Sequence, residues 1–261
     1  MLNLMEKDHS IPKIIHYCWF GDKVIPLKFQ KFIDRWKNLL PAYEFIFWQN
    51  ESLPKDYEYV QAAFKNKKWV NLSNFIRLYS LKMYGGIYLD VDMEIIKPFD
   101  KLLNNLSFLG IESIKNDEIM LNNAIFGAIK DHAFVNECLN HLLNNYKGME
   151  IENITGPVLT TLMYKKYKNQ LSKTITIYPQ EYFYPSNWET PTKINITSNT
   201  YTIHHWEASW HNEFQNLLHK KFKKSLKIYF YHLITGQASL KSSIRYIKLF
   251  VNQFLRTLVN K

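Results

Sequence analysis

The sequence predicts an α/β domain followed by a basic helical segment, and three observations lead to this prediction. Residues 13–48 follow a strand, helix, strand order. Residues 83–96, "MYGGIYLDVDMEII", join two glycines to an apolar strand with paired carboxylates, and residues 219–261 contain no acidic residue. Because ligands bind at the carboxyl ends of the strands in open α/β sheets, we expect a nucleotide-sized crevice there.

The N-terminal elements follow from apolar spacing. Residues 13–20, "KIIHYCWF", are short, apolar and aromatic, as expected for a buried first strand. In residues 27–39 apolar side chains recur at helical spacing opposite basic ones, and residues 43–48 predict a second strand. Trp36 and Trp48 are expected in the core.

A second helix is predicted over residues 71–84, "NLSNFIRLYSLKMY", from the spacing of its apolar side chains. Asn71 or Ser73 could cap its start, and the glycine pair that follows ends it.

Residues 87–96, "IYLDVDMEII", predict one strand in which apolar residues alternate with Tyr88, Asp90 and Asp92. Successive side chains of a strand point to opposite faces, so the two carboxylates point the same way. Such a pair can hold one divalent ion, which prefers oxygen ligands and keeps positions open for water or phosphate. The alternative is a solvated or turn-forming pair.

The middle of the chain is less regular. We expect a strand at 107–111, an apolar run "IMLNNAIFGAI" with paired amides, and a helix at 132–146. The "TGP" at 155–157 predicts a turn that opens a helix, and residues 175–206 are interpreted as rich in strands.

The composition predicts a globular protein of 261 residues with one substantial core, since 46% of the residues are hydrophobic. The formal charge of +10 favours anionic partners, namely nucleotides, phospholipid headgroups or nucleic acid. Cys18 and Cys138 lie in apolar settings and are expected to be reduced core thiols. With neither a signal peptide nor a membrane span in the pattern, we expect a cytoplasmic protein.

The run "NLSNFIRLYSLKMYGGIYLDVDMEIIKPFDKLL" resembles the core motif of glycosyltransferase family 32 and is similar to the glucosyltransferase domains of large clostridial toxins. "IPKIIHYCWFGD" upstream and "IHHWEASW" downstream support the resemblance, which spans residues 11–210 and is loose in the middle. It implies a GT-A type nucleotide-diphospho-sugar transferase fold, a Rossmann-like mixed sheet flanked by helices. The catalytic domain is then 1–218 and the basic helical extension 219–261.

The resemblance assigns the donor site residue by residue. Trp19 matches the aromatic residue that stacks on the nucleotide base, with core packing as the alternative. Arg77 matches the arginine that contacts sugar hydroxyls and phosphate, with a surface ion pair as the alternative. Asn74 stands where the family commonly has an aspartate that binds donor-sugar hydroxyls. An amide binds a sugar hydroxyl without charge assistance, which weakens this hydrogen bond by about 1 to 2 kcal/mol. The substitution is therefore expected to affect donor identity or the catalytic rate.

The same resemblance makes Tyr88 and Asp90 part of the donor site, with Asp90 facing ribose and sugar, and Asp92 the direct metal ligand. The third ligand comes from "TIHHWEASW", where His204, His205 and Glu207 are the candidates. Only one of two successive histidines on a strand is expected to reach the ion. We favour His204, because its position matches the more usual histidine of the family pattern and a neutral imidazole accepts Mn²⁺. The alternative is a histidine held by a core hydrogen bond.

Further positions follow from the family pattern. Ser209 and Trp210 resemble the closing element that contacts the diphosphate, although Trp210 could equally be a packing residue. Asn122 and Asn123 match the place of an amide beside the reacting sugar, with a structural turn as the alternative, and we assign Asn123 a catalytic role with Arg77 and Asp90. Gly156 is expected to let the backbone approach the acceptor, or simply to start a helix.

Together these residues imply a metal-dependent, retaining transfer of a hexose from a nucleoside diphosphate sugar to a glycan hydroxyl. Mn²⁺ or Mg²⁺ is the expected cofactor. A UDP-sugar is the favoured donor. Guanosine diphosphate mannose, which other members of the family use, is the alternative. Bacterial capsule or O-antigen polysaccharide synthesis is the expected context, with a lipid-diphosphate-linked glycan as acceptor. A protein acceptor, as in toxins, is the alternative.

The basic extension has two interpretations. Its apolar residues lie at helical spacing beside lysines and arginines, which suits the anionic inner leaflet of the plasma membrane or packing on the catalytic domain. The apolar positions are Phe222, Leu226, Tyr229, Phe230, Leu233, Tyr246, Ile247, Phe250, Phe254 and Leu258.

Three rival functions remain at this point. Nucleic-acid binding is compatible with the charge and the aromatic content, but no RNP, zinc or helix-turn-helix signature is present, so we expect no nucleic-acid partner. A metal-dependent phosphohydrolase would hydrolyse nucleotide sugar equally fast without acceptor. A catalytically silent sugar-nucleotide binder would show no turnover with any acceptor.

Overall fold

The computed structural model describes residues 10–151, 154–186, 194–206, 222–234 and 240–259. The chain divides into two compact units, 1–206 and 207–261. The boundary expected between residues 218 and 219 lies outside the described residues.

The N-terminal strand, helix, strand order is present as β1 (Ile14–Cys18), α1 (Leu27–Leu39) and β2 (Glu44–Trp48). β1 and β2 pair in parallel, which requires the crossover that α1 provides. Trp36 on α1 and Trp48 on β2 are both buried, as expected for core residues.

Six strands form the central sheet in the order β2-β1-β3-β6-β5-β7. β3 (Gly86–Leu89) pairs in parallel with β1 and antiparallel with β6 (Glu118–Ala128). β5 (Ser107–Lys115) is antiparallel to β6 and parallel to β7 (Thr176–Tyr178). The sheet is therefore mixed, as predicted.

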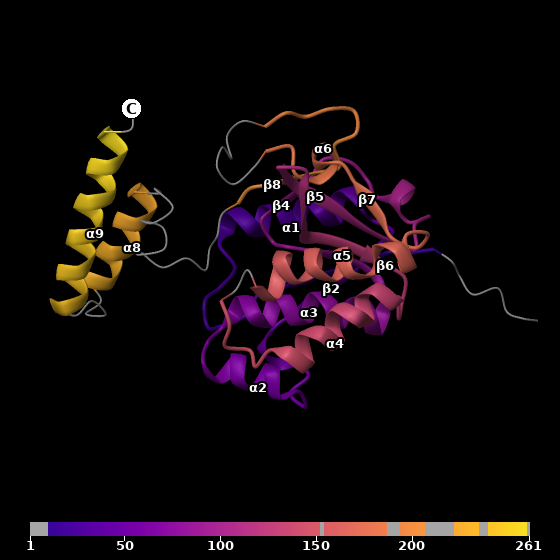
Figure 1. The fold of residues 1–261 in the computed structure, drawn as a ribbon, viewed down its shortest axis with the longest axis horizontal. Coiled ribbons are helices and arrows are strands. Elements are labelled where there is room, and N and C mark those ends of the chain that lie inside the picture. The colour runs from indigo at the N-terminus through magenta and orange to yellow at the C-terminus, as the bar shows by residue number, and fades with distance from the viewer. Residues whose placement is uncertain (1–9, 152–153, 187–193, 207–221, 235–239, 260–261) are drawn as a thin grey trace, which may run out of the picture. The chain divides into compact units, whose positions relative to one another are not determined.

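Helices flank both faces of this sheet (Figure 1). One core cluster joins Tyr88 of β3 to α2 (Glu58–Lys65), α3 (Trp69–Tyr84), α4 (Ala133–Asn145) and α5 (Leu159–Leu171). The other joins Ile87 and Leu89 of β3 to Phe29 and Trp36 of α1. Because neighbouring residues of a strand face opposite ways, the two clusters are the two sides of the sheet. Both cysteines are buried and free, as expected.

Helix α3 begins two residues before the predicted start, so the proposed caps are wrong. Its N-cap is Lys68, which makes no side-chain cap hydrogen bond, whereas Asn71 donates to the carbonyls of Gly148 and Glu150. The helix ends at the glycine pair, as predicted. Gly86 has φ +104°, and a Cβ there would lie 2.6 Å from the Ile14 carbonyl oxygen, so a side chain cannot be accommodated.

The strand predicted over 87–96 is two strands. β3 ends at Leu89, a turn closed by a Met93 N–H to Asp90 carbonyl hydrogen bond of 3.0 Å follows, and β4 (Met93–Ile95) then joins a different sheet. In that sheet β4 pairs antiparallel with β8 (Thr202–His204). The prediction missed the break because the apolar alternation continues through the turn.

The region 175–206 has less strand than predicted. Among its described residues β7 and β8 hold three residues each, and α6 (Gln180–Phe183) lies between them. Phe183 and Tyr184 are fully buried against β5, where Gly110 leaves room: a Cβ on Gly110 would lie 2.6 Å from the Phe183 ring. The turn predicted at 155–157 is part of the wide helical turn Ile154–Val158 that precedes α5.

The second unit contains α8 (Phe222–Ile234) and α9 (Leu240–Val259). Tyr229 and Tyr246 stack with ring centroids 4.1 Å apart, and the Tyr246 hydroxyl lies 2.7 Å from the Ser225 hydroxyl, so the two helices pack on each other. Within the described ranges, neither helix nor any other is long and apolar enough to cross a bilayer.

Candidate active site

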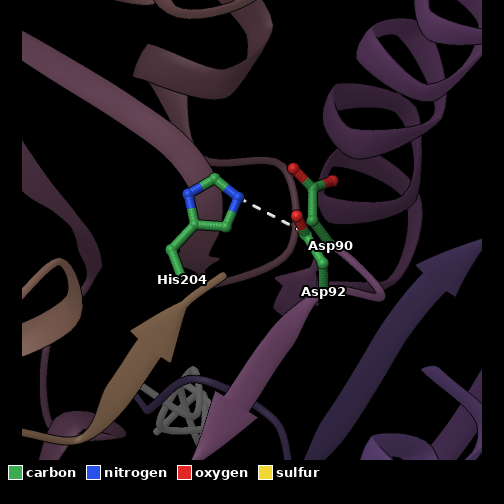
Figure 2. Close-up of side chains that lie close together, drawn as sticks. All are labelled: Asp90, Asp92 and His204. Atoms are coloured by element: carbon green, nitrogen blue, oxygen red, sulfur yellow. Dashed lines mark ion pairs between the residues drawn. The ribbon is translucent and has the colours of Figure 1, made fainter. Parts of the chain in front are cut away.

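Three side chains converge where β3, the turn after it and β8 end. The ligand atoms of Asp90, Asp92 and His204 lie within 4.8 Å of one another, and His204 Nε2 is 3.2 Å from Asp92 Oδ1 (Figure 2). The β4–β8 pairing sets Met93 opposite His204, and the His205 N–H donates to the Asp92 carbonyl at 3.1 Å. The backbone therefore holds the two carboxylates and the imidazole together, although the carboxylates come from a turn.

The electrostatics of this cluster favour a cation. Burial by itself would lower the pKa of His204, but the carboxylates of Asp92, Asp90 and Glu112 raise it, and the net shift is upward. His204 Nδ1 is buried and has no partner among the described residues. Two carboxylates and one imidazole suit Mn²⁺, and the carboxylates also suit Mg²⁺. The residues present thus fit the expected metal.

The second histidine of the motif lies elsewhere. His205 Nε2 is 3.0 Å from Glu94 Oε2, and its ring stacks on Phe32 at 4.7 Å. Arg35 donates to the other oxygen of Glu94 at 2.8 Å. His204, the last residue of β8, thus faces the aspartates, whereas His205, the next residue, belongs to this separate ion-pair cluster.

Arg77 is the centre of a buried hydrogen-bond cluster rather than a surface ion pair. It donates to Asn74 Oδ1 at 2.9 Å, to Asn123 Oδ1 at 2.8 Å and to Asp90 Oδ1 at 2.7 Å. Its side chain is only 4% exposed. Burial alone would lower the pKa of Arg77, but Asp90 raises it above the ordinary value, so the guanidinium is charged.

Threonine hydroxyls fix the two amides of this cluster. Asn74 Nδ2 donates to Thr155 Oγ1 at 3.0 Å, and Asn123 Nδ2 donates to Thr160 Oγ1 at 2.9 Å. At Gly156 a Cβ would lie 3.0 Å from Asn74 Oδ1. The absence of a side chain at Gly156 therefore serves close packing on Asn74, which the sequence analysis did not anticipate.

Tyr88 supports Asp90 from inside the protein. Its hydroxyl donates to Asp90 Oδ1 at 3.0 Å and lies 3.1 Å from Cys18 Sγ, and its ring lies under the Arg77 guanidinium at 4.7 Å. Burial raises the pKa of Tyr88 well above its ordinary value, so the hydroxyl keeps its proton. Tyr88 thus orients Asp90 and Arg77.

Trp19 lies in the loop that follows β1. It is partly exposed, its Nε1 donates to the Lys23 carbonyl at 2.6 Å, and its ring tilts on Phe29 at 6.0 Å. This position leaves part of the indole accessible. Glu207, Ser209 and Trp210 lie outside the described residues.

A further carboxylate, which the sequence pattern does not single out, lies near the paired aspartates and His204. Glu112 on β5 accepts a hydrogen bond from Asn122 Nδ2 at 2.7 Å, and its charge contributes to the raised pKa of His204. Glu112 lies near the site because its strand pairs with the strand that contains "LNNA". The spacing of residues in the sequence does not reveal this pairing.

Two family models match this chain. One, described as a glycosyltransferase sugar-binding region containing a DXD motif, matches residues 26–109; the other, an alpha 1,4-glycosyltransferase conserved region, matches residues 127–253. The chain thus carries two regions that are similar to glycosyltransferases, one of them with the DXD motif. The second match runs through α8 into α9, so this similarity extends into the second unit.

Curated relatives agree with this assignment. Mannosyl phosphorylinositol ceramide synthase SUR1 of Saccharomyces cerevisiae is 28% identical over 62% of this glycosyltransferase and 44% of the relative. Lactosylceramide 4-alpha-galactosyltransferase of Mus musculus is 33% identical over 52% of this chain and 40% of the relative. The chain thus spans less than half the length of these two proteins.

Among solved structures, PaToxG glycosyltransferase resembles this glycosyltransferase with a TM-score of 0.51 and 22% identity, covering 63% of this chain and 73% of that one. Together with the mixed sheet flanked by helices, this likeness confirms the predicted GT-A type fold.

Proposed function

We propose that this glycosyltransferase is a metal-dependent, retaining enzyme that moves a hexose from a nucleoside diphosphate sugar, a UDP-sugar in the first place, to a glycan hydroxyl. The proposal depends on one observation: Asp90, Asp92 and His204 converge beside the buried Arg77 cluster. A cation site next to a fixed guanidinium suits a ligand with a diphosphate at one end and sugar hydroxyls at the other.

Each residue then has a defined task. Asp90, Asp92 and His204 would hold Mn²⁺ or Mg²⁺, which when bound supplies positive charge against the diphosphate. Arg77, with Asn74 and Asn123 on either side of it, faces the sugar hydroxyls and the phosphate. Trp19 stacks on the base, and Ser209 and Trp210 close on the diphosphate; these last two lie outside the described residues.

Retention is proposed to proceed by front-face displacement. The acceptor oxygen forms a bond to the anomeric carbon while the bond from that carbon to the diphosphate oxygen breaks with both electrons to the diphosphate. The hydroxyl proton passes to the leaving diphosphate. Arg77 is already fixed by three hydrogen bonds, so it stabilises the charge that develops without reorganising.

For the acceptor we propose a lipid-linked glycan. Both curated relatives named above act on ceramide lipids according to their names. A lipid-diphosphate-linked glycan of capsule or O-antigen synthesis has the same amphipathic character and remains our narrower proposal. A protein acceptor is the alternative.

The helical second unit could bring the enzyme to such an acceptor. Exposed apolar side chains lie on both helices, among them Phe230 at 53%, Ile247 at 56% and Val251 at 48% exposure. Lys223, Lys227 and Lys248 are exposed as well. Apolar side chains beside lysines match an anionic bilayer surface, so we propose peripheral contact with the inner leaflet of the plasma membrane.

Liposome flotation tests this contact on the full chain. Wild-type protein should float with phosphatidylglycerol vesicles and not with phosphatidylcholine vesicles, and the double variant Ile247→Asp, Val251→Asp should remain in solution. Val24→Asp, an equally drastic change at a position 88% exposed in the first unit, is the matched control. Flotation of the double variant equal to that of the control would contradict membrane contact through this unit.

A thermal-shift panel tests the reaction class. UDP-glucose, UDP-galactose and GDP-mannose are each added with and without Mn²⁺, since a ligand of the native state raises the melting temperature by mass action. We expect a shift for one nucleotide that requires the ion, followed by faster donor turnover when a glycan acceptor is present. Hydrolysis at the same rate without acceptor would indicate a phosphohydrolase. Binding without any turnover would indicate a silent sugar-nucleotide binder.

A further inference from the structure

Glu112 lies at an irregular position of the β5–β6 pair. Ile111 pairs with Leu121 and Ser113 pairs with Met120, so Glu112 is the extra, unpaired residue between them. A bulge of this kind re-aims the side chain of the extra residue and is common next to active sites. The Glu112 carboxylate is turned toward Asn122, whose Nδ2 donates to it at 2.7 Å.

Asn122 is itself fixed on both sides. Its Oδ1 accepts from the Ala124 N–H at 2.7 Å. The Tyr184 hydroxyl donates to the Asn122 carbonyl at 3.2 Å and accepts from the Ile125 N–H at 3.3 Å, which fills the second irregularity of the strand pair. The side-chain amide of Asn122 therefore cannot turn away from Glu112 without losing its hydrogen bond from the Ala124 N–H.

This part of β6 borders the metal cluster. The Ala124 carbonyl accepts from the Asp90 N–H at 2.8 Å, and the Tyr184 ring lies 6.0 Å from the His204 ring. Asn123 contacts the Arg77 cluster, whereas its neighbour Asn122 contacts Glu112. Because successive side chains of a strand face opposite ways, Glu112 lies on the His204 side of β6 and away from the Arg77 cluster.

Glu112 is not explained by the roles assigned so far. It is not among the residues whose ligand atoms converge on the candidate metal position. Partial burial raises the pKa of Glu112, which the Asn122 hydrogen bond offsets only in part. A carboxylate can accept about four hydrogen bonds, and within the described residues the structure records one side-chain donor to it. The site thus retains acceptor capacity for a polar ligand.

We propose that Glu112 binds the incoming hydroxyl group, accepting a hydrogen bond from the acceptor glycan or, in its absence, from the water that replaces it. This inference rests on the proposed function. Glu112 orients the hydroxyl oxygen toward the anomeric carbon on the side of the diphosphate, and the proton still leaves to the diphosphate. The donor is held from the Arg77 side and the attacking group from the Glu112 side.

The test needs no identified acceptor, because hydrolysis of the donor uses water in the same position. Nucleotide release from UDP-glucose, UDP-galactose and GDP-mannose with Mn²⁺ is measured for wild type, Glu112→Gln and Glu112→Asp. The glutamine oxygen still accepts from Asn122, so Glu112→Gln should keep the wild-type melting temperature. Glu118→Gln is the matched control, since Glu118 lies on the same strand pair, 69% exposed and paired with Lys165.

We expect Glu112→Gln to lower kcat about 10- to 100-fold, the range for loss of a hydrogen bond to a charged group. KM for the donor and the Mn²⁺ requirement should stay within about twofold. Glu112→Asp, which keeps the charge on a shorter arm, should recover part of the rate, and Glu118→Gln should match wild type.

Two results would overturn the inference. An unchanged kcat in Glu112→Gln would leave Glu112 a structural partner of Asn122, and a raised KM or an altered Mn²⁺ requirement would make it a donor or metal residue. If wild-type protein neither releases nucleotide nor shows a thermal shift with any donor, the proposed function itself fails, and the inference about Glu112 fails with it.

Discussion

The two halves of the candidate site differ in how completely the protein itself holds them. Arg77 makes three hydrogen bonds to Asn74, Asn123 and Asp90 and is almost fully buried. On the other side, Asp92 and His204 form an ion pair at 3.2 Å, and His204 Nδ1 has no partner among the described residues. Side-chain hydrogen bonds thus fix the buried guanidinium, whereas the other half brings carboxylates and an imidazole together within 4.8 Å.

This difference separates stability from binding. A buried charge that satisfies several groups is costly to remove, because each partner is left without its hydrogen bond. If Asp90, Asp92 and His204 hold a cation as proposed, their contribution to stability should appear mainly when the ligand is bound. Substitutions at Arg77 should therefore mainly lower the free energy of unfolding, and substitutions at Asp92 should mainly weaken ligand binding.

The largest effect on folding is expected for Arg77→Met. It leaves the partly buried Asp90 without the guanidinium and should lower the free energy of unfolding by about 3 kcal/mol, the low end of the range for a broken buried pair. The low end applies because the Asp90 side chain is 28% exposed. Urea unfolding followed by circular dichroism measures it.

Arg35→Met is the matched control, since the Arg35 side chain pairs with Glu94 and is 50% exposed. Its cost should stay below about 1 kcal/mol. Equal losses of unfolding free energy in the two arginine variants would show that the Arg77 cluster contributes no more to folding than an exposed ion pair.

A mainly ligand-dependent effect is expected for Asp92→Asn. Without ligand its free energy of unfolding should fall less than that of Arg77→Met, because the buried His204 can lose its proton when its carboxylate partner is removed, whereas an arginine or an aspartate partner of a broken pair keeps its charge. With Mn²⁺ and UDP at one hundred times the wild-type dissociation constant, it should lack about 2.7 kcal/mol of stabilisation that wild type gains. Calorimetric melting with and without both ligands measures the two numbers.

Glu94→Gln serves as control here, because Glu94 lies beside the cluster but pairs with Arg35 and His205. It should keep the full ligand-dependent shift. A variant Asp92→Asn that retains the shift, or one that unfolds without ligand, would place Asp92 in the structural half.

The sequence was sufficient to predict the fold where local patterns and the resemblance agree. The helical spacing of residues 27–39 predicted α1 with its correct ends, and the glycine pair predicted the end of α3. The break between β3 and β4 was missed because the apolar alternation runs through the turn, where pairing with β8 decides the structure. Long-range pairing of this kind leaves no local signal.

For the candidate site, sequence reasoning named the residues but not their arrangement. Asp90, Asp92 and His204 were proposed as a set and do lie together in the structure. The burial of Arg77, the packing of Gly156 on Asn74 and the place of Glu112 depend on strands far apart in the chain. Only the folded sheet brings these residues into contact.

The smallest effect is expected at Asn74, the position at which the family resemblance described above implies an aspartate. Asn74→Asp still accepts from Arg77, and the Thr155 hydroxyl can turn to donate to it, so folding stability should change little. A charged acceptor should bind a donor-sugar hydroxyl more tightly, by about 1.4 kcal/mol or tenfold in kcat/KM. Steady-state nucleotide release measures this ratio. Asn123→Asp places the same charge on the other side of Arg77, and an equal gain there would mean that added charge, not position 74, sets donor affinity.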